Sequence, residues 1–110
     1  MSPPWSSELA AGLRRDREEL LTAFLIFRAQ LRDTHADEFP GGEDERSRLV
    51  QETEHDSVAL ASAGAEATRL EAMLERADCE VTDREADSAE LLIAQMRELV
   101  TAVVARLPSP

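Results

Sequence analysis

Apolar residues recur along the first third of the chain at alternating spacings of three and four residues. This is the heptad pattern of an amphipathic helix that packs against another helix. It predicts a helix over residues 6–38, about 50 Å long at 1.5 Å per residue. The positions that carry the pattern are Ala10, Leu13, Leu20, Phe24, Phe27 and Leu31.

The middle of this helix is apolar almost all the way round. Leu21, Leu25 and Ile26 lie off the heptad line, so residues 20–27 present apolar side chains on several faces. A helix segment of that kind has to be covered on more than one side. The pattern therefore predicts at least two helical neighbours, from the same chain or from a second copy.

Residues 39–42, Phe-Pro-Gly-Gly, form the clearest break in the pattern. Proline disfavours helix at the residue before it, and glycine permits a reversal of the chain. Acidic residues 43–45 then suit the first turn of a new helix, where the macrodipole favours negative charge. A second helix is predicted over residues 43–77. Its heptad positions are Leu49, Thr53, Asp56, Leu60, Ala63, Ala67, Leu70 and Leu74.

Small residues fill the middle of this second helix, from residue 59 to residue 65. A turn near residue 41 would make the two helices an antiparallel hairpin, with residue 24 opposite roughly residue 58 and residue 20 opposite roughly residue 62. The bulky stretch around Phe24 would then face the small stretch. This match favours the hairpin.

A third helix is predicted over residues 83–107. Thr82 and Glu85 have the spacing of a capping box, although no Gly or Pro enforces a break, so one continuous helix over 43–107 is the alternative. The predicted fold is all-α: a single domain, residues 1–110, with an antiparallel helical hairpin plus a third helix in an up-down-up bundle, completed by dimerisation. The apolar positions of the third helix are Ala89, Leu92, Ile93, Met96, Leu99, Val100, Val103 and Leu107.

Charge narrows the choice of partners. The net charge of −11, with 23 acidic residues against 12 basic ones, makes nucleic acid and anionic membranes poor partners. The one cysteine, Cys79, excludes an internal disulfide and fits a reducing compartment. With no signal-peptide pattern and no apolar run long enough to span a bilayer, we expect a cytoplasmic protein.

Glu52 and His55 have the Glu-x-x-His spacing that di-iron helical bundles use with carboxylates from facing helices. In the predicted hairpin, residues 27–30 would lie opposite them, and these supply no carboxylate. No Ser/His/Asp or Cys/His arrangement has a catalytic spacing. We therefore expect no enzyme, no metal and no cofactor.

His55 also carries a resemblance to histidine phosphotransfer domains, which are acidic helical bundles of similar length. The resemblance covers about half the chain: a histidine on a helix, followed by the Gly64-Ala65 step. It implies a phosphoacceptor role for His55. The sequence departs from the family pattern at Val58 and Ala59, where Lys and Gly are typical.

The function predicted from the sequence is a non-enzymatic protein–protein interaction module: an adaptor, a chaperone-like protein or an assembly subunit. A homodimer through the first and third helices is the expected assembly, and a helical protein partner is the second choice. Histidine phosphotransfer through His55 is the alternative function. The residues expected to make the contact are Leu21, Leu25, Ile26, Leu92 and Leu99.

Overall fold

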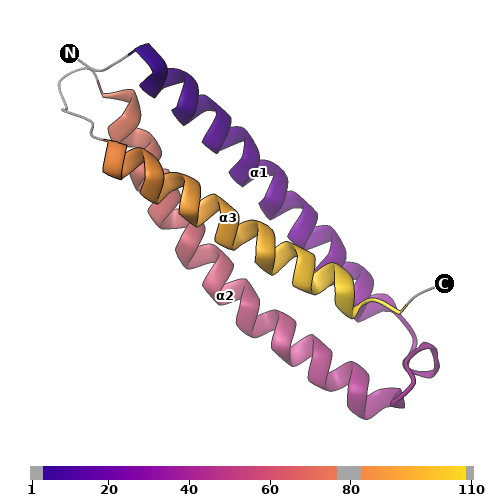
Figure 1. Ribbon diagram of the computed structural model, residues 1–110. Coiled ribbons are helices and arrows are strands. Elements are labelled where there is room, and N and C mark those ends of the chain that lie inside the picture. The colour runs from indigo at the N-terminus through magenta and orange to yellow at the C-terminus, as the bar shows by residue number, and fades with distance from the viewer. Residues whose placement is uncertain (1–3, 77–82, 109–110) are drawn as a thin grey trace.

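A computed structural model describes residues 4–76 and 83–108 (Figure 1). Within these ranges the protein is all-helical, as predicted, with no strand. The elements are α1 (Pro4–Asp33), a short 3-10 helix η1 (Ala36–Glu38), α2 (Gly42–Glu75) and α3 (Asp83–Arg106). α2 and α3 are separate helices, because Arg76 leaves the helical conformation at φ −75° and ψ 126°. Cys79 and the predicted capping residue Thr82 lie outside the described residues.

The three helices form an elongated bundle with extents of 58 × 21 × 16 Å. Each helix packs against both of the others. Figure 1 shows that the chain direction alternates from one helix to the next, and that α3 lies between α1 and α2 in the view.

The core follows the heptad positions. Leu13, Phe24 and Leu31 of α1 are buried, while Leu20 and Phe27 are partly buried against the same cluster. Burial of these side chains supplies most of the favourable free energy of folding. The buried residues contributed by α2 and α3 include Leu60, Ala67, Leu70, Leu74, Ala89, Ile93, Met96 and Val103.

The predicted first helix is too long: α1 ends at Asp33 rather than at residue 38. His35 is extended, with φ −66° and ψ 146°, and η1 follows it. The guanidinium group of Arg46 in α2 donates hydrogen bonds to the backbone carbonyls of Arg32 and, at 2.8 Å, of Thr34. A cationic donor at these carbonyls stabilises a helix C-terminus. The early end of α1 is therefore capped by a residue of the next helix.

Two glycines allow the chain to enter α2. The backbone N–H of Gly41 donates a hydrogen bond of 2.6 Å to Glu45 Oε2. A Cβ atom at Gly41 would lie only 2.7 Å from the Cβ of Glu45. Gly42 has a φ of +70°, a conformation that other residues rarely adopt.

The predicted register of the hairpin is wrong by roughly one to two helical turns. It would set residue 32 opposite residue 50, but Arg32 pairs with Glu54 at 2.7 Å. The difference arises because α1 ends early, so the connection between the helices is longer than the four-residue break that the sequence suggested.

The bulky and small stretches do lie at the same level of the hairpin, but most of the small side chains are not packed beneath α1. Most small side chains between residues 59 and 65 are exposed, and the buried residues of this stretch are Leu60 and Gly64. A Cβ atom at Gly64 would lie 3.8 Å from Met96 Cε of α3, which is an ordinary van der Waals distance. The close neighbour of Gly64 is therefore α3, and it leaves room for a methyl group. The exposed small residues are Ala59, Ala61, Ser62 and Ala65.

We expect Gly64→Ala to raise the free energy of unfolding by about 0.5–1 kcal/mol, because alanine is the better helix former and the added methyl group fits. Urea denaturation followed by circular dichroism measures this change. The matched control, Gly41→Ala, should lower stability because its methyl group would collide with Glu45. An unchanged or lower stability of Gly64→Ala would show that α2 and α3 are closer together than described.

Candidate functional site

Two adjacent large apolar residues on α1 are exposed in the middle of the helix. Leu25 is 53% exposed and Ile26 is 52% exposed, although both lie in the most apolar stretch of the chain. Leu21, also expected at the interaction surface, is partly buried against the core. α2 and α3 therefore cover only part of the apolar surface of α1.

The other two residues expected at the surface lie on α3 and are partly buried. Leu92 and Leu99 both pack against the core cluster. Among the residues whose burial is described, three further large apolar side chains are exposed that were not expected at the surface: Val58 on α2, and Leu91 and Val104 on α3. Val58 is 71% exposed and lies off the heptad line of α2, which is the signal that could have identified it.

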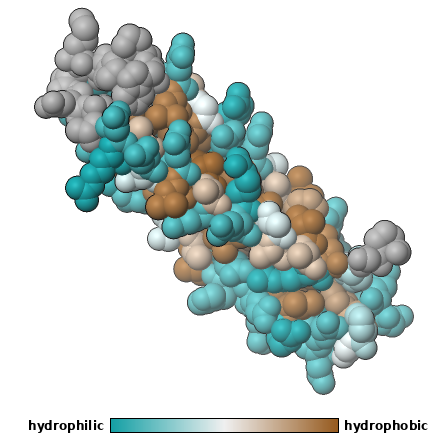
Figure 2. Space-filling view, viewed as in Figure 1, coloured by the Kyte–Doolittle hydropathy of each residue, from teal (hydrophilic) through white to brown (hydrophobic). Residues whose placement is uncertain are grey.

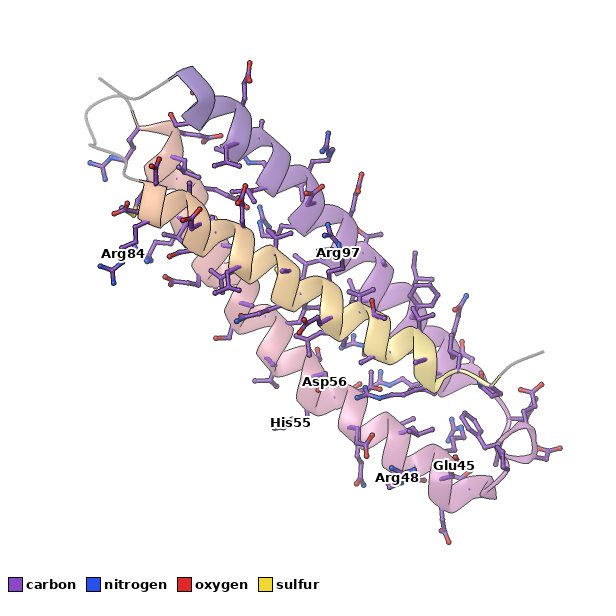
Figure 3. The ribbon with its side chains drawn as sticks, viewed as in Figure 1. Glu45, Arg48, His55, Asp56, Arg84 and Arg97 are labelled. Carbon is purple, nitrogen blue, oxygen red and sulfur yellow. The ribbon has the colours of Figure 1, made fainter. Side chains whose placement is uncertain are left out.

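His55 is exposed on α2. Figure 3 places it on the outer edge of that helix, away from α1 and α3. The nearby Glu52 carboxylate lies 3.0 Å from Arg48 and 3.8 Å from Arg106, so its charge is balanced by arginines. Within residues 4–76 and 83–108, no three His, Cys, Asp or Glu side chains are grouped closely enough to hold a metal ion.

Ion pairs cross the boundary between α1 and α2 near both of its ends. Arg14 lies 2.5 Å from Glu75, and Arg32 lies 2.7 Å from Glu54. Between them, Arg28 Nη1 donates a hydrogen bond of 3.1 Å to Ser57 Oγ. Exposed pairs contribute little stability individually, but their placement fixes which residues of the two helices face each other.

A buried ion pair joins the same two helices. Arg17 Nε donates hydrogen bonds of 3.2 and 3.4 Å to the two carboxylate oxygens of Glu71. The Glu71 side chain is 2% exposed and that of Arg17 is 16% exposed. Arg17 occupies a heptad position of α1, so this charge is placed where an apolar residue would otherwise be expected. Loss of either partner leaves an uncompensated charge in a largely dry environment.

The C-terminal end of α3 is attached to α2 by Arg106. Its Nη1 donates a hydrogen bond of 2.9 Å to Thr53 Oγ1, and Thr53 in turn donates one to the carbonyl of Leu49. Arg106 Nη2 lies 2.6 Å from Asp56 Oδ2. This second contact lacks hydrogen-bond geometry and is an ion pair.

A groove between α2 and α3 has a volume of about 400 Å³. Its apolar lining includes Leu70, Met73 and Leu92. At the rim, the hydrogen bond from Arg69 lowers the pKa of Glu66. At the rim of this groove, Glu66 and Arg69 are therefore paired with each other.

A groove between α1 and α3 is smaller, at about 300 Å³, and more acidic. Its charged lining residues are Glu8, Asp16, Glu90 and a single arginine, Arg97. Figure 3 shows Arg97 on the side of α3 that faces α1. Figure 2 shows hydrophilic side chains over much of the visible surface, with hydrophobic patches gathered between them.

No described helix combines the length and apolarity needed to cross a membrane. The chain matches no protein-family model, no curated protein and no solved structure in the three comparisons.

We expect Glu71→Ala to destabilise the protein by about 3 kcal/mol, because it leaves the Arg17 guanidinium largely buried without a counter-charge. Chemical denaturation measures the loss. The double variant Arg17→Met/Glu71→Leu should recover most of it, since both charges are then replaced by apolar groups of similar size. A double variant as unstable as Glu71→Ala would contradict this interpretation.

Proposed function

We propose that the protein is a non-enzymatic interaction module that acts through apolar helix faces, as an adaptor or assembly subunit. The observation that carries this proposal is the pair Leu25 and Ile26, each more than half exposed at the centre of the longest apolar stretch. A folded monomer rarely leaves a contiguous apolar surface in water, and such surfaces commonly mark contacts with other proteins.

The first partner that we propose is a second copy of the chain. Self-pairing about a two-fold axis is the commonest assembly among soluble oligomers, and it needs only one kind of surface. A homodimer would place exposed apolar side chains of α1, Leu25 above all, in a shared core. A different helical protein that covers the same residues is the second choice.

Light scattering on the purified chain tests this proposal. We expect a particle of about twice the chain mass of 12.2 kDa at tens of micromolar. The double variant Leu25→Glu/Ile26→Glu should reduce the mass to that of the monomer, because two carboxylates would be buried at the contact. The control Ala11→Glu/Ala105→Glu adds the same charge at exposed positions of α1 and α3 and should leave the dimer intact. A well-folded wild-type monomer would rule out self-association.

Phosphotransfer through His55 is the alternative function, and the exposure of this side chain on α2 favours it. Incubation with a small-molecule phosphodonor separates the two proposals. An acid-labile phosphoryl group on the wild type that is absent from His55→Gln would support phosphotransfer. We expect no such group, and we expect His55→Gln to change stability by less than about 0.5 kcal/mol, as is usual for a solvated position.

A further inference from the structure

The side of the α1/α2 hairpin that faces away from α3 carries a continuous line of residues from both helices, which we call the seam. On α1 the seam residues are spaced by seven, four, three and four positions, so they share one helix face. On α2 the spacings are four, three, four and ten, which again select one face. The seam consists of Arg14, Leu21, Leu25, Arg28 and Arg32 on α1, and of Glu54, Val58, Ala61, Ala65 and Glu75 on α2.

The ion pairs show that these two lines of residues face each other. Arg14 meets Glu75 at one end of the seam, and Arg32 meets Glu54 at the other. Most residues of α2 that contact α3 or line its grooves, such as Asp56 and Leu70, lie on a different face of α2. Ala65 is at the edge of the seam, because it also lines a hollow with Leu92 and Gln95 of α3. Apart from this edge, the seam is left uncovered by the third helix.

The centre of the seam is apolar and places a large side chain beside small ones. Arg28 bonds to Ser57. Leu25 precedes Arg28 by three residues, and Ala61 follows Ser57 by four residues. Each therefore lies about one helical turn from that hydrogen-bonded pair. Because the helices are antiparallel, Leu25 and Ala61 lie at the same level. The exposed Leu25 thus lies level with the exposed small side chain of Ala61.

The charge on the seam differs from that of the molecule as a whole. The seam carries three arginines, Arg14, Arg28 and Arg32, against two glutamates, Glu54 and Glu75, although the chain as a whole carries a net charge of −11. The α1/α3 groove, by contrast, sets three carboxylates against one arginine. Two copies meeting at that groove would repel each other, whereas two copies meeting at the seam would not.

From these observations we infer that the seam is the surface on which a second copy docks, hairpin against hairpin about a two-fold axis. A two-fold rotation sets Leu25 of one copy against the small residues of α2 in the other, and the reverse. The two hairpins then pack face to face as two layers of two helices, and each layer carries its own α3 on the outer side. This inference rests on the proposed self-association and names the face that mediates it.

Sedimentation velocity on Ala61→Glu tests this assignment, with Ala94→Glu as the matched control. Ala61 lies in the seam and Ala94 in the α1/α3 groove, and both are exposed on helices. We expect Ala61→Glu to halve the mass, with an unchanged circular dichroism spectrum, and Ala94→Glu to remain dimeric. Ala65→Glu provides a second seam variant and should also be monomeric.

Each contrary outcome identifies which part of the inference is wrong, the self-association or the choice of face. A wild-type monomer would overturn self-association itself, and the seam with it. A wild-type dimer that persists in Ala61→Glu and Ala65→Glu would overturn the seam but leave self-association intact. Dissociation of Ala94→Glu, alone or together with the seam variants, would overturn the choice of the seam over the α1/α3 groove.

Discussion

The structure depends on covering the apolar middle of α1. Residues 20–27 present apolar side chains on too many faces for one neighbouring helix to bury. α2 and α3 bury Phe24 and partly bury Leu20, Leu21 and Phe27, yet Leu25 and Ile26 stay exposed. The same stretch that organises the core therefore also supplies the surface that we propose for association.

Polar contacts give the bundle a specific register that apolar heptads alone would not define. Leucine and alanine layers tolerate a shift of one turn, because the shifted layers remain apolar. The buried pair of Arg17 and Glu71 does not tolerate it, since a shift would separate two charges that are largely removed from water. At the other end of the bundle, the register is fixed by two further contacts. Arg46 of α2 bonds to the carbonyl of Thr34 just after α1, and Arg106 of α3 bonds to Thr53 of α2.

The sequence predicts the all-helical fold, the three helices and most of the core, because these follow from the spacing of apolar residues. The early end of α1 was not predictable in the same way. It depends on Arg46, a residue of the next helix whose contact with the carbonyl of Thr34 exists only after the helices pack. The register was missed for the same reason, since it follows from the length of that connection. Among the candidate site residues, the exposure of Leu25 and Ile26 follows from their positions off the heptad line. The partial burial of Leu92 and Leu99 could not be predicted, because it depends on how α3 lies against the hairpin.

The central claim is that the exposed apolar residues of α1 are covered by a protein partner, with a second copy as the first choice. Thermal unfolding at several protein concentrations tests this claim most directly, because an association that buries apolar surface stabilises the native state by mass action. The account predicts a Tm that rises steadily as the protein concentration is increased from about 5 to about 500 μM. A Tm that stays constant over this range would contradict self-association.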